Sequence, residues 1–443
     1  MKKFGKLLSF AVLILTASLF VFSQEKMTLT LEECIQFALS QNPSHLASEE
    51  RVEGARSMIK EASAGFFPSL SATGLRSLKE KVFSLEFPSF IPGEPPQKVE
   101  MDFTRDNQFS FSLSVPIYTG GRLASGYKQA KYNHLSTEES LRQSEYMTVF
   151  NTKRAFFGVL LAQEFVKVSE EAVIVAEKHV HNVKTLFEVG MASKFDLLRS
   201  EVQLANLKPQ QIRAKNSLKV AELSLKTLLG LDLSQLLDIQ GELTYEPFDP
   251  NLEEALTSAL IKRPEIQQLK YQKMMAGEML KMSKATKIPT VAIQGAYNIW
   301  ADRLTFKEED WQSYYSVNLA MSVPIFSGFL ADAQIAKSKS LIKELEFSKK
   351  GLEDMILFEV RQAVLKLSEA RESLMSQEKN VEQAMESLRI AELNYSEGLA
   401  TTLDVSSVQA ALTQAKTNYS QALYDYVMSR AELDKAIGVG LIN

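Results

Sequence analysis

The sequence predicts an internally duplicated α+β membrane protein, in which a transmembrane β-barrel continues into a long α-helical coiled coil. Three observations predict this fold. The motif SVPIYTG at 114–120 recurs as SVPIFSG at 322–328, with no insertion inside the motif. Each copy follows a segment that alternates apolar and polar residues, which is the period of a β-strand. Each copy also precedes a long apolar pattern that repeats every seven residues, which is the period of supercoiled helices.

The first 23 residues have the features of a secretory signal peptide. Lysines precede an apolar run that ends at Phe22, and Ser23 stands where a cleavage site is expected. The run of about 16 apolar residues is shorter than the roughly 20 that cross a bilayer as a helix, so a retained anchor is the less favoured alternative. We therefore expect the mature chain to begin near Gln24.

The composition argues against an ordinary cytosolic enzyme and against a nucleic-acid partner. The 443 residues include one cysteine, four histidines, 50 Lys plus Arg and 54 Asp plus Glu, and removal of the signal peptide leaves a formal charge near −7. His179 and His181 point about 200° apart on a helix and cannot chelate one metal ion together. The sequence shows no nucleophile–base pair, phosphate loop or metal cluster, so no cofactor is expected. Cys34 lies within LTLEECIQFAL, where it is expected to pack as a small apolar side chain and not to carry a lipid.

The chain consists of two repeats. LEECIQFALSQNP, which begins at Leu31, matches LEEALTSALIKRP, which begins at Leu252, and the offset between the repeats falls from 221 here to 208 at the SVPI motifs. The first repeat therefore carries 13 extra residues between Pro68 and Val115. The predicted divisions are the signal peptide 1–23, the first repeat 24–230 (β-hairpin about 68–117, long helix 121–187, return helix 193–230), the linker 231–251 and the second repeat 252–443 (β-hairpin about 289–326, long helix 329–395, return helix 401–437).

The predicted long helices carry a heptad pattern, with residues such as Val360, Leu367 and Leu374 seven positions apart. As a continuous helix, each long segment would extend about 98 Å. Heptads alone fit a simple coiled-coil rod equally well, but a rod does not explain the alternating segments. Pro209, whose counterpart in the second repeat is Thr417, predicts a kink or break in the return helix.

Four strands are predicted, at about 68–80, 103–117, 289–299 and 312–326. They place apolar side chains on one face and small polar side chains on the other, the pattern of a strand between lipid and water, although a half-buried sheet on a soluble core alternates too. The predicted lipid-facing residues are Phe109, Phe111, Leu113, Val115, Val317, Leu319, Met321 and Val323. The aromatic residues expected to form an interfacial girdle are Trp300, Trp311, Tyr314 and Tyr315. Four strands cannot close a barrel and lipid tolerates no open edge, so several copies must pool their strands, and three copies would supply twelve.

Short motifs predict how the chain changes direction. Pro116 and Pro324 are expected to end strands because proline cannot donate to the ladder, while Gly120 and Gly328 turn the chain into the long helices. Two helical turns follow. Gly190 and Gly398 are expected to be left-handed C-caps, and Ser193 and Thr401 to be N-caps, each three residues before an aspartate, Asp196 or Asp404. The predicted docking tips for a partner are Gly190, Met191, Ala192, Ser193, Gly398, Leu399, Ala400 and Thr401.

Together, the duplication, the SVPIYTGGR and SVPIFSGFL junctions and the turns FEVGMASKFD and YSEGLATTLD resemble the TolC-like outer membrane efflux proteins over essentially the whole mature chain. The resemblance implies a homotrimer with a 12-stranded barrel in the outer membrane of a Gram-negative-type bacterium and an α-helical tunnel through the periplasm. It further implies a passive exit duct of a tripartite efflux or type I secretion system, which meets a periplasmic adaptor protein and an inner-membrane pump of the RND or ABC type. The residues that select the transported substrate are expected to belong largely to the pump.

The resemblance also implies that Asp404 lines a narrow periplasmic mouth, with Asp196 as a weaker contributor. In well-studied relatives a second aspartate stands at the position of Ser407 and an arginine at that of Ala400. Fewer hydrogen bonds and ion pairs are therefore expected to hold this mouth closed. A hydrogen bond from Tyr395 to Asp196 is one of those expected. Two other functions fit part of the sequence: a periplasmic coiled-coil scaffold or adaptor, which needs no lipid-facing strands, and an independent porin, which needs no long helices.

Overall fold

A computed structural model describes residues 27–78, 83–101, 106–302 and 304–439, so the predicted signal peptide lies outside the described residues. Its contacts divide the chain into two compact units, each built from both repeats. The first unit takes in 1–50, 140–266 and 351–443, and the second takes in 51–139 and 267–350. The long helices of the two repeats contribute to both units.

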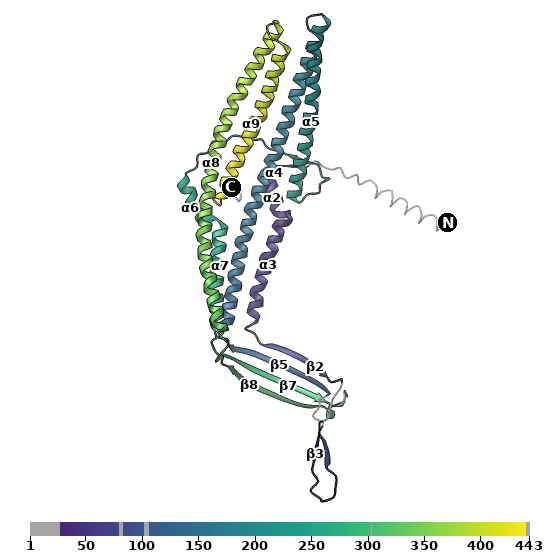
Figure 1. The fold of residues 1–443 in the computed structure, drawn as a ribbon, viewed down its shortest axis with the longest axis vertical. Helices are drawn as coiled ribbons and strands as arrows, with labels where there is room; N and C mark the ends of the chain where they lie inside the picture. Colours follow the sequence, from purple (N-terminus) through teal and green to yellow (C-terminus); the bar gives the residue numbers. More distant parts are fainter. Residues whose placement is uncertain (1–26, 79–82, 102–105, 303, 440–443) are drawn as a thin grey trace, which may run out of the picture. The chain divides into compact units, whose positions relative to one another are not determined.

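The helices repeat with the spacing that the sequence predicts. They are α2 (Leu31–Gln41), α3 (Pro43–Ala64), α4 (Arg122–Glu188), α5 (Lys194–Leu229), α6 (Leu252–Lys262), α7 (Pro264–Ala285), α8 (Leu330–Ser396) and α9 (Thr402–Ala436). Figure 1 shows α4 beside α5 and α8 beside α9, each pair joined by a short turn. The helices α4 and α8 have 67 residues each, or about 100 Å at the usual rise. Within the described ranges, none of the helices combines the length and apolar character needed to cross a membrane.

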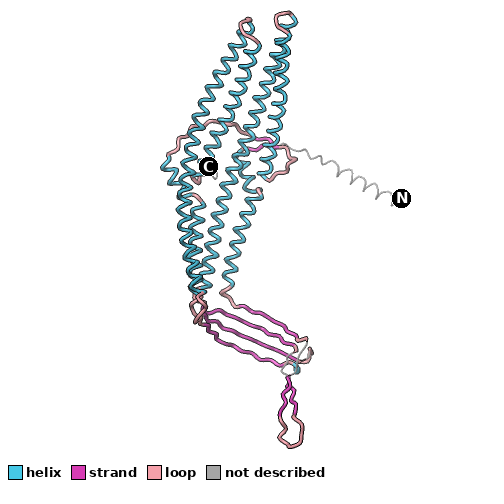
Figure 2. Tube along the Cα trace, in the orientation of Figure 1, coloured by secondary structure: helices cyan, strands magenta, loops and turns pink. Residues whose placement is uncertain are grey.

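The second unit contains one four-stranded antiparallel sheet with the order β2-β5-β7-β8 (Figure 2). Its strands are β2 (Ser69–Arg76), β5 (Asn107–Tyr118), β7 (Thr290–Ala301) and β8 (Gln312–Ser322). Each repeat supplies one neighbouring pair, and β5 joins β7 at the centre, with Leu113 opposite Gly295. Strands β2 and β8 therefore form the outer edges of the sheet. The four strands confirm the prediction, although positions 79–80 and 103–105 of the predicted hairpin lie outside the described residues.

Two small sheets were not predicted. Strand β1 (Met27–Leu29) pairs in parallel with β6 (Leu237–Ile239), which lies in the predicted linker. Strands β3 (Phe83–Phe87) and β4 (Gln97–Met101) form an antiparallel hairpin within the segment that is longer in the first repeat. Its tip, FPSFIPGEPP, is rich in proline, and proline disfavours a strand, so the sequence of this segment predicts a loop.

Each repeat has its own hydrophobic cluster in the first unit. In the first repeat, α2 packs on α4 and α5 through residues such as Cys34, Phe156 and Leu225, and in the second repeat α6 packs on α8 and α9. The side chain of Cys34 is fully buried, as expected for a packing residue. Burial raises the pKa of the Cys34 thiol to about 12, because the thiolate would lose its hydration.

The prolines near the strand ends differ from the prediction. Strand β5 continues two residues beyond Pro116, and the register with β7 shifts between Pro116 and Tyr118. A proline is tolerated here because the irregular ladder needs no N–H at that position. Strand β8 ends at Ser322, two residues before Pro324, because Ser322 pairs with Thr290, the first residue of β7. Neither proline is therefore the last residue of its strand.

The turns into the long helices contain left-handed residues, as predicted for the glycines. Gly120 and Gly328 have φ values of 63° and 61°. A Cβ atom on Gly120 would lie 2.9 Å from the Cβ of Ile288, so the close approach also favours glycine. The second repeat replaces the next glycine, Gly121, with Phe329, which keeps a positive φ of 65°.

Pro209 does not break its helix. Helix α5 runs from Lys194 to Leu229 with Pro209 inside it, so the predicted break is absent. A single missing N–H is compatible with a continuous helix when packing on neighbouring helices holds both halves.

Candidate functional site

The four-stranded sheet has one apolar face whose rows are continuous across the strands. One row contains Leu70, Leu113, Gly295 and Val317, and the next contains Ala72, Phe111, Tyr297 and Tyr315. These side chains stay exposed on a single chain: Val317 and Leu319 keep 74% and 73% of their surface. An apolar surface of this kind requires a partner or lipid. The predicted lipid-facing residues within the strands thus share one face, while Val323 lies just beyond β8.

The opposite face carries small polar side chains. Its rows include Ser69, Ser114, Gln294 and Asn318, and then Ser71, Ser112, Ala296 and Ser316. Hydroxyl and amide groups of this size suit a water-filled space.

The predicted aromatic girdle divides between the two faces. Tyr315 is in register with Phe111 and Tyr297 on the apolar face, and the ring of Trp311 lies 5.8 Å from that of Phe109. Trp300, in contrast, pairs with Gln108 and Gln312 on the polar face. All four aromatic residues lie near the end of the sheet where β7 ends and β8 begins, as predicted, but they occur on both of its faces.

The two helical turns have the same backbone hydrogen bonds. In the first turn Gly190 N donates to Phe187 O at 3.0 Å and Met191 N to Leu186 O at 2.8 Å. In the second turn Leu399 N donates to Asn394 O, also at 2.8 Å. With φ values of 79° and 73° at Gly190 and Gly398, these are Schellman motifs, so the predicted glycine C-caps are confirmed.

The next helices begin with capping boxes, which confirms the predicted N-caps. Asp196 N donates to Ser193 Oγ at 3.1 Å, and the carboxylate of Asp196 accepts from Ser193 N at 3.3 Å. Asp404 and Thr401 form the same box, with Thr401 Oγ1 donating to Asp404 Oδ2 at 2.7 Å. The hydrogen bonds from the Thr401 side chain and backbone hold the pKa of Asp404 below its ordinary value.

The remaining residues of the predicted constriction lie close to the second turn. Ser407 Oγ donates to Asp404 O at 2.9 Å, within its own helix. The hydroxyl of Tyr395 accepts from Thr402 Oγ1 at 3.5 Å, and its ring lies 5.6 Å from that of His179. The proposed partner Asp196 is instead engaged by Ser193. His179 is buried, which lowers its pKa, whereas His181 is exposed on a different face of α4.

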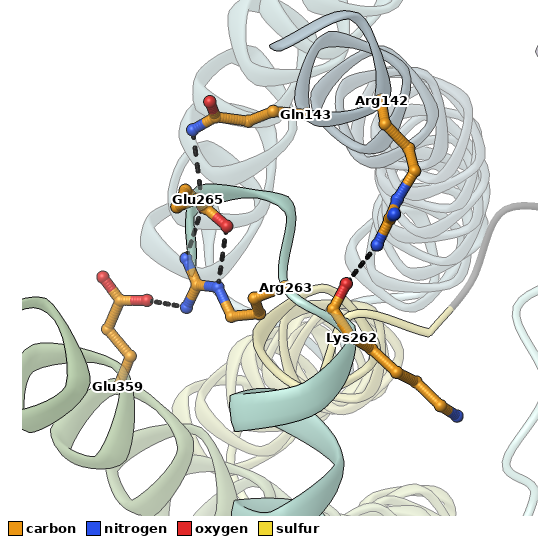
Figure 3. A network of polar contacts seen from close by, with 6 residues as sticks. All are labelled: Arg142, Gln143, Lys262, Arg263, Glu265 and Glu359. Atoms are coloured by element: carbon orange, nitrogen blue, oxygen red, sulfur yellow. Dashed lines mark hydrogen bonds and ion pairs between the residues drawn. The ribbon is translucent and has the colours of Figure 1, made fainter. Parts of the chain in front are cut away.

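A polar network at the corner between α6 and α7 was not predicted (Figure 3). Arg263 is 7% exposed and donates to both carboxylate oxygens of Glu265, at 3.2 and 2.8 Å. It also donates to Glu359 of α8, and Gln143 of α4 donates to Glu265 at 3.3 Å. Arg263 therefore connects the corner to α8 directly and to α4 through Glu265.

The repeat makes this corner asymmetric. Arg263 replaces Asn42, whose Nδ2 donates to Leu228 O at 2.8 Å. In both repeats a glycine with a positive φ lies against the corner, where a side chain would be crowded. A Cβ atom added to Gly230 would lie 2.7 Å from Gln41 O, and one added to Gly438 would lie 3.2 Å from Lys262 C. Both repeats have this glycine packing, and the second repeat adds the ion pairs of Arg263.

Arg263→Ala is expected to destabilise the detergent-purified protein by about 3 kcal/mol, at the low end for a broken buried ion pair because Glu359 keeps 39% exposure. Burial raises the pKa of Glu265, but the hydrogen bonds and charge of Arg263 outweigh burial and lower it. The stabilisation from this depressed pKa is present above the unfolded pKa and is lost as pH falls through the folded one. Without Arg263 the pKa of Glu265 rises. The difference in denaturation midpoint between the wild-type protein and Arg263→Ala should therefore be larger at pH 7 than near pH 4.

Arg389→Ala is the matched control, because Arg389 binds Glu386 through two hydrogen bonds of 2.8 and 2.7 Å on an exposed helix face. An exposed pair of this kind is expected to change the midpoint little. Equal shifts for both variants would contradict the role assigned to the corner.

Comparison with known proteins places this architecture in a family. The family model described as "Outer membrane efflux protein" matches residues 34–231 and 255–439. The alkaline protease secretion protein AprF of Pseudomonas aeruginosa is 23% identical, over 76% of this chain and 72% of that protein. The outer membrane protein TolC of Vibrio cholerae is 24% identical, over 70% of each chain. The probable efflux pump outer membrane protein TtgC of Pseudomonas putida is 23% identical, over 93% of this chain and 83% of that protein.

Solved structures share the fold. The outer membrane protein VceC of Vibrio cholerae has a TM-score of 0.73 at 17% identity and covers 93% of this chain and 97% of its own. The open-state outer membrane channel MtrE of Neisseria gonorrhoeae has a TM-score of 0.73 at 17% identity, and the match covers 93% of this chain and 89% of that one. The chain therefore belongs to the outer membrane efflux proteins, channels of the bacterial outer membrane with a periplasmic extension, which transport and do not catalyse.

Proposed function

We propose that three copies of the chain form a passive exit duct for a tripartite efflux or type I secretion system. The observation that carries this proposal is the sheet with one apolar face and two outer edges, β2 and β8. Unpaired edge groups are too costly in lipid, so β8 of one copy pairs with β2 of the next until the sheet closes. Three copies supply twelve strands, and the polar face then lines the lumen.

The turns at Gly190–Ser193 and Gly398–Thr401 dock a periplasmic adaptor protein in this proposal. They are similar in backbone geometry and occur twice per chain, so a trimer would present six of them. Each carries a highly exposed apolar side chain, Met191 at 78% and Leu399 at 79%. The adaptor connects the duct to an inner-membrane pump of the RND or ABC type, which supplies the energy and selects the cargo.

Heat-modifiable migration of outer-membrane extracts tests the closed barrel. Unheated samples should migrate as a trimer and boiled samples as a monomer, because a closed barrel has no edge at which unfolding can start. A periplasmic scaffold or adaptor would be released without detergent and would show no such shift. Recovery of the chain in the soluble periplasmic fraction would overturn the proposal.

Asp404 is proposed to set the ion selectivity of the periplasmic mouth. Three copies around a threefold axis would repel one another, which opposes the low pKa that Thr401 imposes, and would attract cations. Asp404→Asn should therefore sharply reduce cation selectivity, measured as the reversal potential of single channels in a salt gradient.

Asp196→Asn is the matched control, because Asp196 has the same capping box in the first repeat and should matter less. An Asn at either position can still accept from the N-cap backbone, so both variants should fold. An unchanged reversal potential in the Asp404 variant would leave this residue with a capping role only.

A further inference from the structure

One aromatic pair lies on the polar face of the sheet. Trp300 near the end of β7 and Tyr314 near the start of β8 contact each other edge to face, with ring centroids 5.7 Å apart and planes at 64°. The register places Trp300 opposite Gln108 and Gln312, and Tyr314 opposite Asn298. Leu75 of β2 occupies the same row on the far side of Gln108. Apolar side chains thus gather at this one level of the polar face.

Most of the other residues on the polar face are small or polar, unlike this aromatic pair. Apart from Leu75, Trp300 and Tyr314, the polar face holds only Ser, Thr, Asn, Gln or Ala from this row to the row of Ser69, Ser114, Gln294 and Asn318, and Pro116 lies in the row beyond. Lipid does not account for aromatic rings on the polar side, because the apolar face has its own aromatic pair, Phe109 and Trp311, with rings tilted at 43° at the same level.

We propose that Trp300 and Tyr314 form an aromatic collar inside the outer end of the duct, which binds planar organic cations as they leave. The inference rests on the proposed trimer, in which the polar face lines the lumen and three pairs surround it. Tryptophan is the strongest aromatic partner for a cation, and its ring also stacks on planar molecules.

The adjoining loop favours a positive charge on the ligand. Between β7 and β8 the turn Glu308–Asp310 presents three exposed carboxylates next to a single lysine, Lys307. Trp311 Nε1 donates to Thr305 O at 2.9 Å, which ties the loop to the start of β8. The segment between β7 and β8 has four acidic and two basic residues, and its net negative charge raises the local concentration of cations at this end of the sheet.

Single-channel recording with 9-aminoacridine, a planar aromatic cation, tests the collar in the purified full-length protein. The wild-type pore should show blocking events from the outer side, and Trp300→Leu should shorten their dwell time about 3- to 30-fold, the range expected for loss of a cation–π contact. Trp300→Phe should retain most of the dwell time. Tetraethylammonium has the charge but no ring, so it can make the cation–π contact without stacking, and Trp300→Leu should shorten its dwell time less than that of 9-aminoacridine.

The matched control is Phe109→Leu, which removes one ring of the pair at the same level of the apolar face and leaves the hydrogen bond from Trp311 to the loop in place. This variant should leave the dwell time unchanged, and heat-modifiable migration identifies any variant that fails to assemble. A second readout uses Trp311→Phe, which leaves Trp300 as the only tryptophan, since the chain has two. Bound 9-aminoacridine should quench the fluorescence of Trp300.

The outcomes separate the two proposals. Unchanged dwell time in Trp300→Leu, or an equal loss in Phe109→Leu, overturns the collar while the duct stands. Absence of any ion-conducting pore from the wild-type protein overturns the duct, and the collar with it.

Discussion

Leu319→Arg is expected to remove the assembled channel from the outer membrane, whereas Asn318→Arg leaves it in place. Leu319 keeps 73% of its surface exposed and pairs with Ile293 on the apolar face, while the adjacent Asn318 pairs with Gln294 on the polar face. An arginine on the lipid face near mid-membrane costs roughly 2 to 4 kcal/mol. Threefold symmetry repeats the cost in every copy. The measurement is the amount of heat-modifiable trimer in outer-membrane extracts.

The adjacent position makes the comparison strict, because both variants add the same side chain to the same strand. They differ only in the face that receives the charge. If the two variants assembled equally well or equally poorly, the assignment of the apolar face to lipid would be wrong.

Features with a local cause could be predicted from the sequence. The strands follow from a period of two and the long helices from a period of seven. The turns were predictable to the residue, because Gly398 and Thr401 act through hydrogen bonds within their own turn. Duplication strengthened each prediction, since every local signal occurs twice.

Features that depend on residues far apart in the chain could not be predicted. The network around Arg263 needs Gln143 and Glu359 from two other helices, and no local pattern shows that these residues meet. The cross-strand neighbours of Trp300, Gln108 and Gln312, depend on the register between β5, β7 and β8. One signal was available for Arg263: a charged residue stands where the first repeat has Asn42.

Bulky labels on the helical turns are expected to abolish transport without disturbing the trimer. Met191→Cys and Leu399→Cys place a thiol two residues before an N-cap, on side chains that are 78% and 79% exposed. The native Cys34 will not compete for the label, because it is fully buried and its pKa is raised to about 12. A fluorescein maleimide at either site should block access of the adaptor by its volume.

The matched control is a methylthio group at the same two cysteines, which modifies the thiol but adds little volume. Transport should survive this modification, because the Schellman hydrogen bonds at Gly190 and Gly398 involve only the backbone. Trimer migration should be the same for both labels, which separates loss of docking from loss of assembly. Export of a pump substrate by cells with fluorescein on all turns would remove docking from this site. If fluorescein blocked transport only at Leu399, the two turns of each chain would have different roles. The adaptor would then recognise side chains that differ between the repeats and not the backbone conformation that the two turns share.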